Sequence, residues 1–192
     1  MIAARGNNGG DGLVAARLIR TLGVPVRVLL ASPEGAFRAD SEPGRNLSAA
    51  RSVGVPVEDA SAAGALRALD RALPPRRLVV DAVFGTGLEG TVRGPLAAVL
   101  EWLSSQVRPV VAADLPSGLD ADTGELLGAA PRCVATATFL APKQGLLRGR
   151  GPELAGRVTV CDIGVPLDAA LPRAGARDAR DGSPPGSPRS PR

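Results

Sequence analysis

The sequence predicts an α/β fold in which a mostly parallel sheet is covered by helices on both faces. Short apolar runs without polar alternation are separated by stretches of helical periodicity, as in strands buried on both faces. The length of 192 residues fits one domain, and 44% of the residues are apolar. Only four residues are aromatic, so we expect a core built mainly from Ala, Val and Leu.

Strands and helices alternate along the chain. Strands are predicted over residues 1–4, 26–31, 55–57, 78–84, 110–114, 134–140 and 158–162, and helices over residues 11–22, 44–53, 61–72 and 95–106. Gly10 or Asp11 is expected to cap the first helix, which Gly23 and Pro25 end. Connections between parallel strands are expected to be right-handed.

The composition changes near Pro166, and this divides the chain into two parts. Residues 1–165 are predicted to form the folded domain. Residues 166–192 are rich in Pro, Ser, Gly and Arg and lack apolar periodicity, so we expect a disordered tail.

Composition excludes several kinds of chemistry. The chain has no His, which rules out His-dependent triads and His metal sites, and its two Cys residues cannot form a zinc cage. Acid–base work is left to carboxylates, to backbone dipoles or to Lys143, the one lysine beside 22 arginines. The net charge of +4 is too small to indicate nucleic-acid binding, and no apolar run is long enough to span a membrane. We expect a cytoplasmic protein.

Four polar loops follow predicted strands, and the carboxyl ends of parallel strands meet at one edge of a sheet. These loops comprise residues 6–12, 85–91, 114–120 and 141–145. The first is rich in glycine and precedes a helix, which suits an anion, but it matches neither the dinucleotide fingerprint nor the P-loop. Its two Asn amides could bind a hard cation or a carboxamide, although a plain turn would also explain Asn-Gly.

Two aspartates stand out by their positions. Asp81 lies within an apolar strand, where a carboxylate is costly to bury unless it is paired, hydrogen-bonded or bound to a cation. Asp114 ends the next strand, the place expected of a catalytic or ligand carboxylate. Ser117 follows Pro116 and can offer its hydroxyl to an ion or ligand.

Four motifs in order carry a family resemblance. GNNGGDGLVAAR, VVDAVFGTGLEGTVRGP, VVAADLPSGLDADTGE and ATFLAPKQGLL resemble the NAD(P)H-hydrate epimerase family, also known as the YjeF N-terminal domain, over about residues 2–165. The resemblance implies a Rossmann-like three-layer α/β/α sandwich, usually dimeric. It implies an isomerase that interconverts the 6R and 6S epimers of NADHX and NADPHX in nicotinamide nucleotide repair, before a partner dehydratase acts on the S epimer.

The resemblance also implies site residues. Substrate contacts fall on Asn7, Asn8, Gly9, Gly10, Asp11, Gly85, Thr86, Gly87, Leu88, Glu89, Gly90, Thr91 and Asp114. Potassium ligands fall on Asn8, Asp81 and Ser117, an oxygen-only set that agrees with the preference of hard cations. Asp114 is our candidate for proton transfer. Lys143 either lines the site by charge or is structural.

The chain also departs from the family pattern. It begins within the first strand, without the family's opening helical region, and Arg5 stands where the family tends to have Pro. The sequence is therefore interpreted as N-terminally truncated, and one sheet face is expected to be left uncovered. The tail stands where some relatives continue into a dehydratase domain.

Three other interpretations stay open. The chain could be a non-catalytic scaffold, because the same fold serves in binding proteins, although the aspartates of its loops argue for catalysis. It could be an epimerase that is inactive because of its short start. It could be a nicotinamide-dependent oxidoreductase with Glu34 as the ribose-binding acid, although the loop spacing does not fit.

Overall fold

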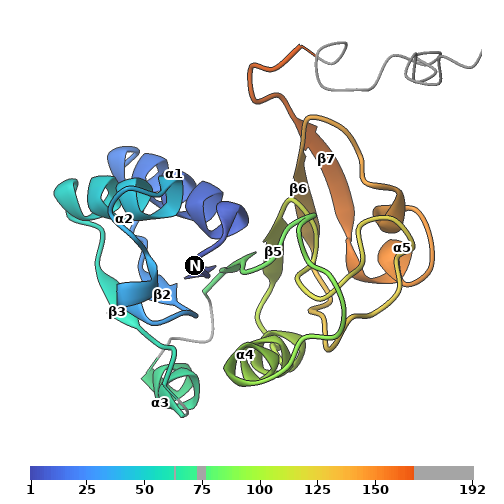
Figure 1. The fold of residues 1–192 in the computed structure, drawn as a ribbon, viewed down its shortest axis with the longest axis horizontal. Helices are drawn as coiled ribbons and strands as arrows, with labels where there is room; N and C mark the ends of the chain where they lie inside the picture. The colour runs from blue at the N-terminus through green and yellow to red at the C-terminus, as the bar shows by residue number, and fades with distance from the viewer. Residues whose placement is uncertain (63, 73–76, 167–192) are drawn as a thin grey trace, which may run out of the picture.

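The fold is built on one parallel sheet. The computed structural model describes residues 1–62, 64–72 and 77–166, and within them seven strands pair in the order β3-β2-β1-β4-β5-β6-β7 (Figure 1). The strands are β1 (Ile2–Ala3), β2 (Val28–Leu30), β3 (Val57–Asp59), β4 (Val79–Ala82), β5 (Val110–Ala113), β6 (Ala135–Phe139) and β7 (Arg157–Cys161). Every pairing between neighbouring strands is parallel. The order reverses between β1 and β4, as in Rossmann-like folds.

Helices cover both faces of the sheet. They are α1 (Asn7–Thr21), α2 (Glu42–Ser52), α3 (Ala65–Ala72), α4 (Pro95–Ser104) and α5 (Gly151–Leu154), with short 3-10 turns at Glu34–Ala36 and Gln144–Leu146. Figure 1 shows α1 and α2 together on one side of the sheet and α3 and α4 on the other. The predicted three-layer arrangement is confirmed.

Two apolar clusters hold these layers together. Leu13 of α1 and Leu47 of α2 pack with Val28 and Leu30 on one face. On the opposite face, the cluster joins α3 and α4 to the sheet, and its members include Ile2, Leu29, Leu66, Val79, Leu100, Leu103 and Val110. Because neighbouring strand residues point to opposite faces, Ile2 and Ala3 of the short β1 belong to different clusters.

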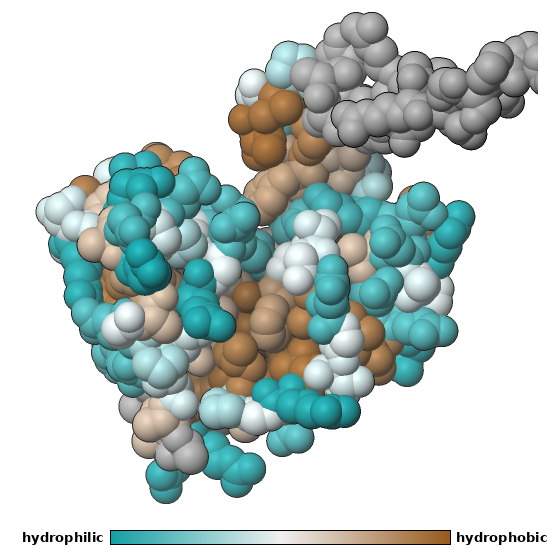
Figure 2. All heavy atoms as spheres, viewed as in Figure 1, coloured by the Kyte–Doolittle hydropathy of each residue, from teal (hydrophilic) through white to brown (hydrophobic). Residues whose placement is uncertain are grey.

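The face of β5, β6 and β7 that lies on the α1 side is less covered. Val110 and Ala112 pack in the α4 cluster, so Val111 and Ala113 point the other way. These two residues are half-buried, as are Ala135, Ala137 and Phe139 of β6. In Figure 1 no helix lies over this face of β6 and β7, and Figure 2 shows apolar residues in the hollow between the two halves of the molecule. Among the described residues this face is half-buried, so the expected lack of cover is found only in part.

The predicted strands and the four predicted helices are all found, with shifted ends. The first helix begins at Asn7 with Gly6 as its N-cap, so the prediction that Gly10 or Asp11 caps it is wrong. The close approach of Gly9 to β1 allows this early start, since a Cβ there would lie 1.7 Å from the Ala4 carbonyl oxygen. The short helix α5 was not predicted.

The remaining differences lie in loops. α3 begins at Ala65, later than predicted, because the N–H and hydroxyl of Ser61 donate to Asp59 and hold a turn there. The predicted disordered tail lies, apart from Pro166, outside the described residues. None of the helices described by the structure is long and apolar enough to cross a membrane.

Candidate functional site

A cavity of about 430 Å³ lies where the strand order reverses, beyond the carboxyl ends of β1, β4 and β5. Open α/β sheets bind their ligands at this kind of position. The cavity is lined by Gly6, Asn7, Asn8, Asp11, Val83, Phe84, Gly85, Thr86, Gly87, Leu88 and Asp114. Three of the four predicted loops therefore meet, as the sequence indicated.

The start of α1 forms one wall of the cavity. The first hydrogen bond there runs from the N–H of Gly10 to the carbonyl of Gly6 at 3.0 Å, and no side chain caps the helix. The N–H groups of residues 7–9 precede that bond and are free of helical partners. The helix has 15 residues and no acidic residue in its first turn, so its positive end suits a phosphate.

Five predicted contact residues lie outside the cavity lining. Gly9 and Gly10 are buried, Gly9 against the backbone of Ala4 and Gly10 beside Pro43 of α2; the absence of a side chain at Gly9 allows the close approach of α1 to Ala4. Residues 89–91 leave the site because the N–H of Val92 donates to the carbonyl of Leu127 at 2.7 Å and draws the chain away.

Asp114 lies at the centre of the cavity wall, directly after β5. Its φ of +72° is unusual for a residue other than glycine, and its N–H donates to the carbonyl of Ala137 at 2.8 Å. The side chain is about nine-tenths buried, and Oδ1 lies 2.5 Å from Nζ of Lys143. Strained backbone of this kind is common at functional sites.

Asp11 brings a second carboxylate to the cavity. Burial raises the pKa of Asp11, and the charges of Asp114 and Glu42 raise it further. Two carboxylates with different surroundings at one cavity are an arrangement that can serve as acid and base.

Asp81 has entirely different surroundings. Its side chain is fully buried and accepts hydrogen bonds from the N–H of Ser117 at 2.8 Å and from the Ser117 hydroxyl at 2.6 Å. The N–H of Val83 donates a longer bond of 3.3 Å. Burial raises the pKa of Asp81 to about 6, although these hydrogen bonds act in the opposite direction.

Among the described residues, Asn8 is a buried polar residue at the cavity whose side chain has no hydrogen-bond partner. It is 7% exposed, and neither its Oδ1 nor its Nδ2 has a hydrogen-bond partner. Such orphaned polar atoms are costly unless a ligand or ion satisfies them. A Cβ on Gly85 would lie 3.3 Å from Cβ of Asn8, and the N–H of Phe84 donates to the Ser117 hydroxyl at 2.8 Å. The turn at residues 84–85 thus links Asn8 to the Asp81–Ser117 pair.

These donors fit a hard cation better than a zinc-type metal. Among the described residues, no three His, Cys, Asp or Glu side chains lie close enough to hold a metal. The group around residue 84 instead offers an amide oxygen, a hydroxyl and one buried carboxylate, which are hard donors. The orphaned Oδ1 of Asn8 is the observation that favours an ion here.

Lys143 is the residue whose role the sequence left open, and it contacts Asp114 without lining the cavity itself. Its ion pair with Asp114 shows that Lys143 is not a structural residue remote from the site. The signal was its place in a loop after a strand, together with the rarity of lysine in this chain. Glu34, the candidate ribose acid of the oxidoreductase interpretation, is instead held by Arg51 through two bonds of 2.6 and 2.8 Å.

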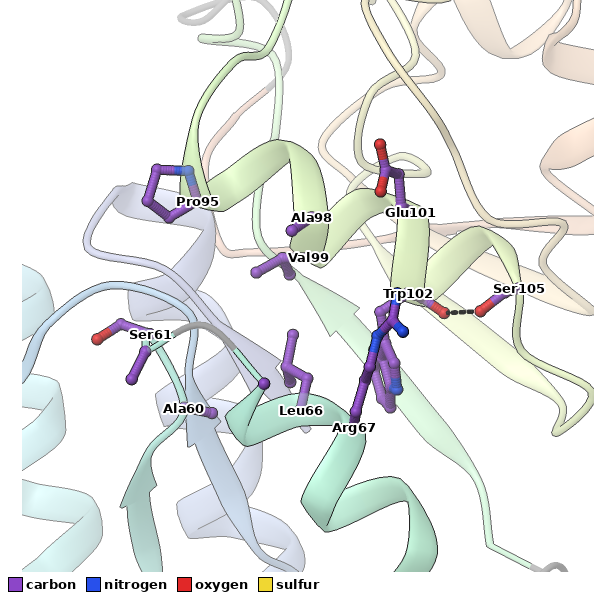
Figure 3. Close-up of a pocket in the computed structure, with 12 residues that line it drawn as sticks. Ala60, Ser61, Leu66, Arg67, Pro95, Ala98, Val99, Glu101, Trp102 and Ser105 are labelled. Atoms are coloured by element: carbon purple, nitrogen blue, oxygen red, sulfur yellow. Dashed lines mark hydrogen bonds between the residues drawn. The ribbon is translucent and has the colours of Figure 1, made fainter.

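A second cavity, of about 470 Å³, lies between α3 and α4. Figure 3 shows Leu66 of α3 facing Val99 and Trp102 of α4 across it, with Arg67 and Glu101 near its edge. It contains none of the predicted site residues, and its walls are largely apolar. The polar groups that could perform chemistry lie at the strand-order reversal.

Comparison with known proteins shows the family of the chain. Residues 1–145 match the family model described as YjeF-related protein N-terminus. An NAD(P)H-hydrate epimerase from Oenococcus oeni is 35% identical over 86% of this chain and 73% of its own length. A bifunctional NAD(P)H-hydrate repair enzyme from Salinibacter ruber is 42% identical over 91% of this chain.

The coverage of these relatives is unequal. This chain spans about a third of the length of the bifunctional enzymes, 34% of the Salinibacter protein and 31% of one from Moorella thermoacetica. The crystal structure of yeast ynu0 shares the fold with a TM-score of 0.69 and 26% identity, over 88% of this chain and 68% of that one. The chain belongs to the YjeF-related N-terminal family, in which its relatives include NAD(P)H-hydrate epimerases.

Proposed function

We propose that this chain converts (6R)-NADHX and (6R)-NADPHX to their 6S epimers, a repair step for hydrated nicotinamide nucleotides. The observation that carries the proposal is the position of Asp114, a nearly buried carboxylate in the cavity between the start of α1 and the glycine turn after β4. The names of the single-domain relatives support the same activity.

The backbone around the cavity supports binding of a dinucleotide. The free N–H groups at the start of α1 would hold the pyrophosphate, with the turn at residues 85–88 on the opposite wall. Holding the substrate at both walls would fix the hydrated ring beside Asp114, and such orientation lowers the barrier of the reaction.

Asp114 would move the proton that epimerisation requires. Inverting C6 needs either loss and re-addition of its hydroxyl or opening and closure of the ring, and both routes move a proton. The carboxylate of Asp114 can accept that proton and return it. It is the candidate because the chain has no His or Tyr that could do so. Asp11 lines the same cavity and has a raised pKa, so it supplies a second carboxyl for binding or protonation.

We also propose potassium as the ion held by Asn8, Asp81 and Ser117. The orphaned amide of Asn8 and the buried carboxylate of Asp81 support this assignment. Bound there, the ion would stabilise the buried charge and orient polar groups of the substrate. No step of the reaction is assigned to it.

The wider setting belongs to the proposal as well. We propose that the chain forms a homodimer, lies in the cytoplasm and acts alongside a separate ADP- or ATP-dependent dehydratase. The bifunctional repair enzymes among the relatives support the link to a dehydratase. The two free thiols fit a reducing compartment.

The direct test is to incubate the full chain with purified (6R)-NADPHX and to follow the 6S epimer by chromatography. Conversion above the spontaneous rate is expected for the wild type, and its absence would contradict the proposal. Calorimetry with the same ligand separates the alternatives: binding without turnover indicates a scaffold or an inactive short form, and no binding excludes the site itself.

A further inference from the structure

Lys143 and Asp114 form a largely buried ion pair that a tight turn after β6 brings together. Leu140 has a φ of +66°, and the N–H of Ala141 donates to the carbonyl of Phe139 at 2.7 Å, so the chain reverses directly after the strand. Nζ of Lys143 then donates to the same carbonyl at 2.7 Å and lies 2.5 Å from Oδ1 of Asp114. The Lys143 side chain is 16% exposed.

The contacts to the Asp114 carboxylate all fall on one oxygen. The Thr138 hydroxyl and the Phe139 N–H lie at 3.4 Å from Oδ1, on the same side as Lys143. Within the described part of the chain, no donor is hydrogen-bonded to Oδ2. That oxygen lies 3.1 Å from the place a Cβ on Gly85 would occupy, at the cavity wall. One oxygen is fixed and the other faces the substrate space.

We propose that Lys143 is the positioning residue for Asp114, an inference that rests on the proposed epimerase function. The ammonium group fixes Oδ1 and so directs Oδ2 toward the substrate. The proton moves between the substrate and Oδ2 of Asp114, and Lys143 keeps its own protons throughout. Lys143 therefore acts through Asp114 and does not replace it as the acid or base.

The chemistry of lysine suits this place. A compact ammonium fits between two oxygens, the Phe139 carbonyl and Asp114 Oδ1, whereas the planar guanidinium of arginine presents a wider fork. All 22 other basic side chains of the protein are arginines. The inference therefore predicts that arginine at position 143 restores the charge but only part of the positioning.

The kinetic test compares variants of the full chain in the epimerase assay. Lys143→Met is expected to lower kcat on the order of 100-fold with little change in KM, because misplacing a reacting group costs about that much. Lys143→Arg should lie between Lys143→Met and the wild type. Arg148→Met removes a positive charge from an exposed position of the following loop and should leave kcat unchanged.

A double variant decides between action through Asp114 and an independent role. Adding Lys143→Met to Asp114→Asn should reduce kcat no further than Asp114→Asn alone. Losses that multiply would overturn the inference. The double variant also leaves no unpaired buried charge, so it stays informative where the single Lys143→Met chain fails to fold.

Crystal structures of Lys143→Met and the wild type give a readout that needs no activity. The inference requires the Asp114 carboxylate to rotate away from Gly85 in the variant. An unmoved carboxylate overturns the inference even where the wild type epimerises normally. If the wild type has no epimerase activity but the Asp114 carboxylate is rotated in Lys143→Met, the proposed function is contradicted and the positioning role of Lys143 is not.

Discussion

Asp81 lies in β4 and Asp114 directly follows the neighbouring β5, yet the structure gives them opposite surroundings. Asp81 lies inside β4, fully buried, with both carboxylate oxygens hydrogen-bonded to neighbouring backbone and to Ser117. Asp114 lies one residue beyond β5, with Oδ1 paired to Lys143 and Oδ2 at the cavity. Asp81 pairs in register with Ala112, so a difference of two positions along the strands separates a closed site from an open one.

The comparison shows how one sheet edge can carry two kinds of carboxylate. Within a strand, the side chain is enclosed by the layers, so its charge requires hydrogen bonds or an ion nearby. Beyond the strand end, the left-handed backbone of Asp114 turns the side chain toward solvent-accessible space. These surroundings support the proposal that Asp81 serves stability and ion binding and that Asp114 serves the chemistry.

The largest expected effect concerns Asp114. Asp114→Asn should lower the kcat of epimerisation between about 10²- and 10⁴-fold, the usual contribution of a positioned acid or base, because the amide cannot accept the proton. The rate of formation of the 6S epimer measures this. Asp122→Asn, at an exposed position, is the matched control. Near-normal turnover in Asp114→Asn would remove Asp114 from the mechanism.

Ser117→Ala tests the closed site. It removes the hydroxyl that donates to Asp81 and accepts from the Phe84 N–H, so two buried groups lose a partner. The free energy of unfolding in urea should fall by about 1–3 kcal/mol. Ser104→Ala, on the exposed side of α4, should change it by less than about 0.5 kcal/mol. Equal stability of the two variants would contradict the structural role given to Ser117.

Potassium should stabilise the closed site through Asn8. At ten times its dissociation constant, a bound ion adds about 1.4 kcal/mol to the free energy of unfolding. Thermal melts in KCl and in choline chloride should differ for the wild type and agree for Asn8→Ala. Asn46→Ala, whose amide only donates a long bond of 3.4 Å to the Gly10 carbonyl, should keep the wild-type response. A wild type indifferent to potassium contradicts the ion assignment.

The smallest expected effect concerns Asp11, whose pKa is raised in the folded protein. Folding then favours its protonated form, so its contribution to stability is full below the unfolded pKa and is lost as the pH rises through the folded pKa. Asp11→Asn should therefore raise the Tm near pH 8 by no more than about 2 °C, since the group is partly exposed. The difference from the wild type should vanish near about pH 3.5. A constant difference across this series would be inconsistent with the raised pKa.

Much of the fold could be predicted because the strands are continuous apolar runs. Val79–Ala82 and Val110–Ala113 are examples, and their ends were predicted within two residues. The start of α1 was predicted four residues late, because Asn and Gly are poor helix formers, whereas in the structure this first turn packs closely against Ala4 through Gly9. Contacts between distant segments override local preference there.

The sequence predicted the residues of the candidate site but not the hydrogen bonds and ion pairs between them. Asp81, Asp114 and the glycine loops follow from their places in the pattern of strands. The hydrogen bonds between Asp81 and Ser117, 36 residues apart, and the ion pair between Asp114 and Lys143 depend on how β4, β5 and β6 lie side by side. Residues 89–91 share a motif with the cavity turn but lie outside the cavity lining, because the N–H of the following Val92 donates to the carbonyl of Leu127.

The amino-acid order alone determined which segments become strands and which loops are polar, and it left acid–base chemistry to carboxylates, backbone dipoles or Lys143. Hydrophobic periodicity and residue type are local properties, so they can be seen without a structure. Only the packed sheet decided that Asp81 is enclosed and Asp114 open, and that Lys143 fixes one oxygen of its partner. These outcomes depend on burial and on distances of a few ångströms between residues far apart in the chain, which local patterns do not specify.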